Sequence, residues 1–106
     1  MPEDDFRDRV RVVLIEPSQS RNVGAVARAM VNLGFSRLEL VAPRGYDREQ
    51  AGVSARDAGF VLDGARVHES FVDALDGVEE VVGLALRHGD NPERFVTLPA
   101  WSAARA

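Results

Sequence analysis

An apolar run followed by a polar turn and a helical pattern constrains this fold most. Residues 10–15 are apolar except for Arg11, which predicts a strand buried on both faces, as in a parallel sheet. A helix is expected over residues 22–33, with Gly34 as its C-terminal stop. A strand, a polar turn and a helix that opens on Asn22 build a site for a negatively charged or polar ligand at the strand's C-terminal edge.

The expected helix has two faces. Apolar residues at helical spacing predict a core face made of Val23, Val26, Ala27, Met30 and Leu33. Another face places Arg28 among small residues, where an arginine packs poorly but could reach into a site at the strand edge. The small residues Ala25 and Ala29 on that face would let another surface come close.

Later segments alternate between strand and helix patterns. Further strands are expected at 38–41, 65–67 and 80–86. Further helices are expected at 49–58, broken by Gly59, and at 71–75, with Ser70 as N-cap and Gly77 as stop. This alternation predicts an α/β fold with an open, mostly parallel sheet and flanking helices. We divide the chain into a polar N-terminal lead (1–9), an α/β domain (10–90) and an irregular tail (91–106).

Composition excludes several kinds of site. The chain has no cysteine, and all 13 basic residues are arginine, which excludes thiolate catalysis, Cys-based metal sites, Schiff-base lysines and P-loop lysines. The net charge of −4 means that any RNA site must be a local patch. No apolar run is long enough to span a bilayer, and the acidic N-terminus is no signal peptide, so we expect a cytoplasmic protein.

Arginines follow the expected strands. One group lies where three strands end and comprises Arg21, Arg44, Arg48, Arg87 and Arg94. Because parallel strands end at one edge, these side chains and Arg28 are expected to form a cationic rim there. Guanidinium groups bind phosphates through forked hydrogen bonds. The alternative is that loops are exposed and arginine is the only base available to fill them.

Other catalytic templates are missing or weak. The sequence has no GxGxxG and no GxxxxGK[ST], and its two histidines lack metal-ligand spacing. His68 is expected at the surface, whereas His88, beside Arg87, could belong to a site. Ser18 and Ser20 lack a base partner for a hydrolytic triad. No metal site is expected, and Trp101 is expected to pack against the body rather than stack on a base.

The stretch Val13-Leu14-Ile15-Glu16-Pro17-Ser18, continued by Asn22-Val23-Gly24-Ala25-Val26-Ala27-Arg28-Ala29-Met30 and Asn32-Leu33-Gly34, resembles the first motif of a known family. The family is the SpoU (TrmH-type) RNA 2′-O-ribose methyltransferases of the SPOUT superfamily, and the branch is TrmJ-like. The likeness covers roughly residues 10–90. It implies that the chain is the Rossmann-like N-terminal half of a SPOUT fold and faces the RNA substrate.

The resemblance implies methyl transfer from S-adenosylmethionine to a ribose 2′-hydroxyl, with tRNA as the expected RNA partner. Arg28 falls on the family's catalytic arginine and Asn22 on its motif asparagine. With the arginine rim, this gives an RNA- and phosphate-binding set of Ser18, Arg21, Arg44, Arg48, Arg87 and Arg94. The full family fold also implies a homodimer.

The chain departs from the family pattern at its C-terminal side. The motifs of the C-terminal trefoil knot, which bind S-adenosylmethionine and build the dimer, are absent, and Leu84-Ala85-Leu86 replaces part of the third-strand motif. Cofactor binding is therefore assigned to no residue, and the isolated chain is expected to be inactive. It is either the front of a longer enzyme or a stand-alone remnant. Two alternatives stay open: a non-catalytic RNA- or phosphate-binding module, and a dimerisation domain that uses the Ala25/Ala29 face.

Overall fold

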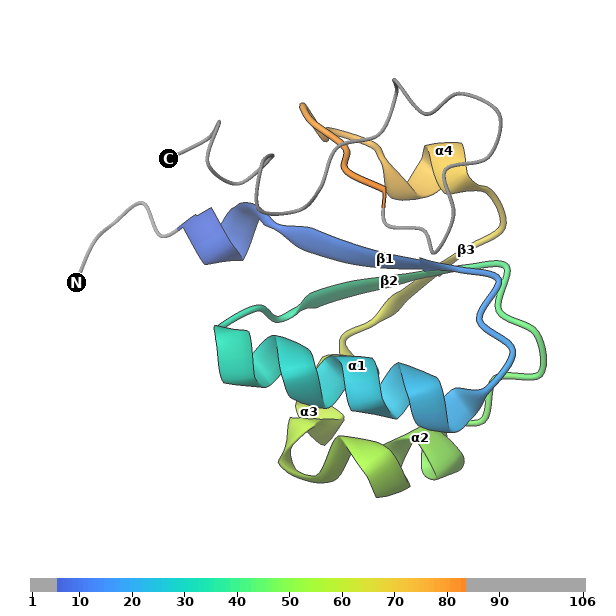
Figure 1. The fold of residues 1–106 in the computed structure, drawn as a ribbon. Coiled ribbons are helices and arrows are strands. Elements are labelled where there is room, and N and C mark those ends of the chain that lie inside the picture. The colour runs from blue at the N-terminus through green and yellow to red at the C-terminus, as the bar shows by residue number, and fades with distance from the viewer. Residues whose placement is uncertain (1–5, 84–106) are drawn as a thin grey trace.

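The computed structural model describes residues 6–83, which form a parallel sheet with helices on both faces (Figure 1). The strands are β1 (Arg11–Ile15), β2 (Arg37–Val41) and β3 (Arg66–His68). They pair in the order β1-β2-β3, and both pairings are parallel. The predicted α/β class is confirmed, and so are the strands predicted at 10–15, 38–41 and 65–67, each within a residue or so of its expected ends.

The helices divide between the two faces of the sheet. One face carries α1 (Ser20–Leu33), α2 (Arg48–Ala55) and α3 (Gly59–Asp63), and the other carries α4 (Phe71–Ala74) (Figure 1). Two 3₁₀ turns complete the elements, η1 (Phe6–Arg9) and η2 (Arg56–Ala58). Within residues 6–83, no helix is long and apolar enough to cross a membrane.

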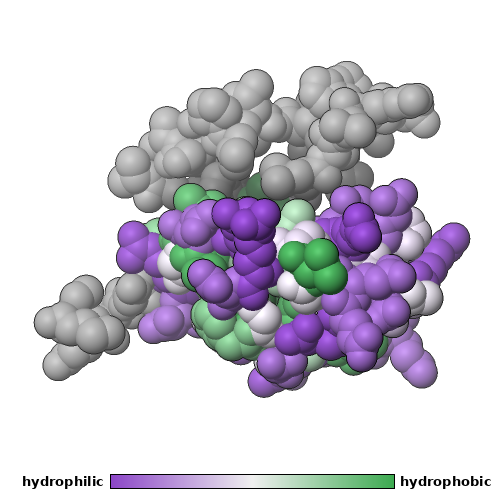
Figure 2. Space-filling model, turned by 90° about the horizontal axis from the view of Figure 1, so that it is seen from below, coloured by the Kyte–Doolittle hydropathy of each residue, from purple (hydrophilic) through white to green (hydrophobic). Residues whose placement is uncertain are grey.

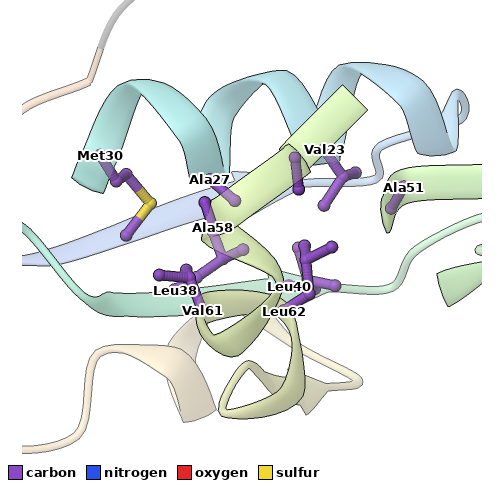
Figure 3. Packing of buried hydrophobic residues seen from close by; sticks show 10 residues of the cluster. Val23, Ala27, Met30, Leu38, Leu40, Ala51, Ala58, Val61 and Leu62 are labelled. Carbon is purple, nitrogen blue, oxygen red and sulfur yellow. The ribbon is translucent and has the colours of Figure 1, made fainter. Parts of the chain in front are cut away.

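The core lies between β2 and the face of α1 that the sequence predicts to be apolar. Leu38 and Leu40 alternate with Glu39 along β2, so both leucines point to the α1 side of the sheet. The buried apolar cluster consists of Val23, Ala27, Met30, Leu38, Leu40, Ala51, Ala55, Ala58, Val61 and Leu62 (Figure 3). Leu33, which was predicted to belong to it, is 64% exposed, because α1 ends there beyond the sheet.

The two ends of α1 differ in how well the sequence predicts them. Gly34 ends the helix as expected, with φ of 88°, and its N–H donates to the carbonyls of Met30 and Val31. The helix begins at Ser20, two residues before the predicted start, and its N-cap is Gln19, whose side chain makes no capping bond. The expectation that the helix opens on Asn22 is therefore wrong, because Asn22 already lies within the first turn.

β1 is one of the two edge strands of the described sheet. Its first four residues are only half-buried and Ile15 is exposed, so the prediction of burial on both faces is wrong. Arg11, the polar exception in this strand, donates to the carbonyl oxygens of Ala74 (3.1 Å) and Asp76 (2.6 Å) at the end of α4. The strand predicted at 80–86 is not observed over residues 80–83, since these residues pair with no described strand, and its remainder lies outside the described residues.

The helix predicted at 49–58 breaks earlier than expected. α2 ends at Ala55, and Arg56 turns the chain with a positive φ of 53° while its N–H donates to the carbonyl of Gly52. Gly59, the predicted break, instead begins α3. This turn lets Ala55 and Ala58 both face the core. The helix predicted at 71–75 is confirmed.

A polar pair lies on the α4 side of the sheet. His68 Nε2 and Glu39 Oε1 are 2.7 Å apart, and their side chains are only 17% and 4% exposed. The expectation that His68 is a surface residue is wrong, because β3 places it one diagonal step from the buried carboxylate of the central strand. His68 thus provides a partner for the Glu39 carboxylate, which would be costly to bury without one.

Replacing His68 with alanine is expected to lower the free energy of unfolding by about 2–4 kcal/mol, since the Glu39 carboxylate would lose its partner in a buried site. Urea denaturation of the full-length protein at neutral pH measures this. A Glu39→Leu/His68→Leu double variant, which removes both polar groups, is expected to recover part of the loss. Equal midpoints for His68→Ala and the parent protein would contradict a stabilising pair.

Candidate functional site

The loops after β1 and β2 meet at the carboxyl edge of the sheet. Glu16 N–H donates to the carbonyl of Val41 (2.7 Å), and Arg44 N–H donates to the carbonyl of Pro17 (2.9 Å). Glu16 and Ala42, the first residues after the two strands, both have positive φ, 50° and 46°. Non-glycine residues rarely adopt this conformation, and such residues gather at functional sites. Backbone conformation thus marks the edge where ligands are expected.

Side chains also tie this edge to the helices. Ser20, which is buried, accepts a hydrogen bond from the N–H of Asp47 (2.8 Å). Asp47 in turn caps α2, because its carboxylate accepts from the N–H groups of Glu49 (2.9 Å) and Gln50 (3.4 Å). Ser54 Oγ donates to the carbonyl of Arg21 (2.6 Å). The first turns of α1 and the whole of α2 are therefore held in a fixed relation.

Two of the predicted site residues share a small cleft beside β1. Ser18 and Asn22 line a cavity of about 230 Å³ whose other walls are Leu14, Ile15, Pro17, Gln19, Val23 and Val26. Most of this lining is apolar, and its polar side chains are the Ser18 hydroxyl and the amides of Gln19 and Asn22. The structure thus brings Ser18 and Asn22 to the same cleft, and their roles stay predictions.

Arg28 lies in a different cleft. A cavity of about 530 Å³ is lined by Arg28, Val31, Asn32, Ala55, Arg56, Asp57 and Ala58. Asn22 and Arg28 are six positions apart, roughly 240° around a helix, so they lie on different flanks of α1. The expectation that Arg28 shares one rim with the residues at the strand ends is wrong. Its cationic neighbour is instead Arg56, from the turn after α2.

The arginines of the expected rim differ in their contacts and exposure. Arg44 forms an ion pair with Glu16, and both side chains are largely exposed, so the pair holds Arg44 at the strand edge only weakly. Arg21 is exposed in the first turn of α1. Arg87 and Arg94 lie outside the described residues.

Arg48 points away from the edge and supports α3. Its Nε donates to Asp63 (2.9 Å) and its NH2 to the carbonyl of Gly59 (3.3 Å). The hydrogen bond to Asp63 raises the pKa of Arg48 above its usual range. Burial raises the pKa of the neighbouring Tyr46 phenol, against a smaller opposing effect of Arg48. Arg48 thus contacts α3 in this structure, and its expected place in the phosphate-binding set stays a prediction.

Sequence reasoning missed Arg56 and Asp57 as cleft residues. The only signal was a charged pair between small residues in Ala55-Arg56-Asp57-Ala58. A regular helix through residue 58 would have carried Arg56 elsewhere, and the break at a non-glycine residue has no sequence signature. In residues 6–83, no group of three or more His, Cys, Asp or Glu side chains could hold a metal ion.

Known proteins resemble this chain over most of its length. The SpoU rRNA Methylase family model matches residues 9–102. A tRNA (cytidine/uridine/adenosine-2′-O-)-methyltransferase TrmJ of Pseudomonas aeruginosa is 42% identical over 80 residues, covering 76% of this chain and 31% of the relative. The tRNA (cytidine-2′-O-)-methyltransferase TrmJ of Methanocaldococcus jannaschii is 33% identical over 82 residues, covering 76% and 36%.

Solved structures of methylase family proteins share the fold of this chain. A probable methylase family protein from Haemophilus influenzae superposes with a TM-score of 0.70 at 39% identity, covering 80% of this chain and 37% of that one. TrmJ from Z. mobilis ZM4 superposes with a TM-score of 0.58 at 42% identity, covering 60% of this chain and 29% of that one. The chain thus spans about a third of the length of the relatives it matches. With the strand–turn–helix motif in place and Arg28 standing in a cleft, the match over residues 9–102 shows that the chain belongs to the SpoU rRNA methylase family.

Proposed function

We propose that this protein takes part in 2′-O-ribose methylation of tRNA, and that the present chain supplies part of the surface that faces the RNA. The observation that carries the proposal is the position of Arg28. It matches the arginine of the family's first motif and is exposed in a cleft, and its guanidinium group forms no hydrogen bond or ion pair with another residue of the described range. The names of the TrmJ relatives support tRNA as the substrate.

Arg28 would act through its charge and its donors. A guanidinium stays protonated at any physiological pH, so it is a poor proton acceptor. Five N–H donors allow it to orient a ribose 2′-hydroxyl or an adjacent phosphate and to stabilise the negative charge that develops on the oxygen. The cleft is large enough for a sugar–phosphate unit.

Family membership implies S-adenosylmethionine as methyl donor, but the described residues do not build a site that fits it. The cleft beside β1 is smaller than a typical pocket for a molecule of that size. The Arg28 cleft carries two guanidinium groups, which would repel a sulfonium cation. Asn22, whose catalytic role the resemblance suggests, lines only the smaller cleft, and we propose that it orders the turn before α1.

The family fold also implies a homodimer, which we keep as a proposal. Ala25 and Ala29 are exposed on α1 and leave room for the close approach of another surface. An action on tRNA further fits a cytoplasmic protein.

Methyl transfer to unmodified tRNA transcripts tests the proposal directly. The full-length protein, with S-adenosylmethionine labelled on its methyl group, is expected to label tRNA and to make one phosphodiester bond resistant to alkali, because a 2′-O-methyl group removes the attacking hydroxyl. A transcript with a 2′-deoxy sugar at that position is the control and should stay unlabelled.

The outcomes separate the candidate functions. The isolated 106-residue chain is expected to give little or no label. Label on a base, or no label from the full-length protein, would contradict ribose methylation. Salt-sensitive RNA binding without any label would instead support the non-catalytic binding module.

A further inference from the structure

The Arg28 cleft contains a second arginine, which comes from the turn between α2 and α3. We propose that Arg56 and Arg28 form a two-guanidinium clamp for one phosphate of the bound RNA, an inference that rests on the proposed function and adds a residue to its site. Neither the family motif nor the sequence pattern assigns Arg56 a role.

The backbone at Arg56 is unusual for this residue. Its φ of 53° and ψ of −118° lie in a region of backbone conformation that strains residues with a Cβ atom but that glycine adopts without strain. The residues on either side explain the direction of the side chain, because Ala55 and Ala58 are buried and the chain between them must turn outward. A costly conformation therefore presents a long cationic side chain to the cleft.

The charges in the cleft favour an anion. The side chains of Arg28 and Arg56 are both exposed, and neither guanidinium group forms a hydrogen bond or ion pair within residues 6–83. Asp57 lines the same cleft but is joined to neither arginine by an ion pair in that range. Two like charges that share a cleft repel each other, and a bound phosphate would relieve this repulsion while it accepts forked hydrogen bonds from both.

The surroundings suit the polar backbone of RNA. The cleft opens between α1 and the turn after α2, and Asn32 adds an amide to its lining. The face that carries α2 and α3 is predominantly hydrophilic, with apolar residues scattered over it (Figure 2). This favours a charged backbone over an apolar peptide as the occupant.

An Arg56→Gly substitution tests the clamp, because it removes both the guanidinium group and the backbone strain at this position. For full-length Arg56→Gly, the Kd for fluorescein-labelled, unmodified tRNA transcripts is expected to rise about tenfold at moderate salt, and the slope of log K against log salt to fall by about 0.7–0.9. The melting temperature is expected to stay equal or to rise. Arg56→Gln, which keeps the strain, should lose the same affinity without the gain in stability.

Arg66→Gln is the matched control. It removes the same charge from β3, which does not line the cleft, and should keep the parent Kd within about twofold. Parent affinity and slope in both Arg56 variants, or an equal loss in Arg66→Gln, would overturn the clamp. Methyl transfer by the parent protein is measured in parallel. If the parent protein transfers methyl groups but the Arg56 substitutions do not weaken RNA binding, only the clamp is rejected. If the Arg56 substitutions weaken RNA binding but the parent protein transfers no methyl group, only the proposed function is rejected.

Discussion

A Gly24→Ala variant is expected to lose roughly 3 kcal/mol of unfolding free energy, although alanine is the better helix former. A Cβ at Gly24 would lie 1.9 Å from the carbonyl oxygen of Ala51 and 2.5 Å from Ser54 Oγ. Backbone cannot yield as a flexible side chain does, so α1 and α2 would have to move apart. That movement would also loosen the hydrogen bond from Ser54 to the carbonyl of Arg21.

Urea denaturation of the full-length protein, followed by circular dichroism, measures the loss. Gly52→Ala is the matched control, because it makes the same change within α2 but a Cβ there would meet only the end of the Arg48 side chain, at 2.6 Å. It is expected to change stability by less than about 1 kcal/mol. If the two variants unfold at the same midpoint, close helix contact is not the reason for glycine at position 24.

The contact at Gly24 also bears on the site. α1 carries Arg28, and the turn that ends α2 carries Arg56, so the separation of these helices sets the width of the cleft. Gly24 belongs to the stretch on which the family resemblance depends, and its place against Ala51 gives that glycine a packing reason. A variant that widens the gap should therefore weaken RNA binding even where it still folds.

Much of the fold could be predicted because local signals agree with one another. The apolar run at 10–15, the helical spacing of Val23, Ala27 and Met30, and the stop at Gly34 each predict an element that the structure contains. The start of α1 was misplaced because Asn22 is a favourable cap and Gln19, the actual N-cap, makes no side-chain bond. At the start of α1, the path of the loop after β1 decides where the helix begins, and the capping preference of asparagine does not.

The site was harder to predict than the fold. The rule that parallel strands share one ligand-binding edge places six of the thirteen arginines on one rim, but it ignores the direction in which each side chain leaves the backbone. Arg48 turns to Asp63, and Arg28 leaves α1 on a flank away from Asn22. Arg56 could not be found at all, because its position depends on a strained turn that no periodic pattern reveals.

Replacing Arg28 with alanine in the full-length protein is expected to cut methyl transfer to tRNA by about 10²–10³-fold, the usual cost of removing one donor from a site where negative charge develops. Arg28 is exposed, and no residue of the described range depends on its guanidinium for a hydrogen bond. The melting temperature should therefore move by no more than about 2 °C. Initial rates with labelled S-adenosylmethionine, read beside a thermal melt, measure both quantities.

Arg28→Lys separates charge from geometry. Lysine keeps the positive charge but lacks the planar fork, so it should recover only part of the lost rate if Arg28 positions the ribose or phosphate through two hydrogen bonds. Full recovery would assign the effect to charge alone. The exposed Arg66→Gln variant removes a charge from β3 and should keep the parent rate, which controls for weaker steering of the RNA. Parent-like turnover in Arg28→Ala would remove this side chain from the mechanism and leave the family's first motif in this chain with a structural role only.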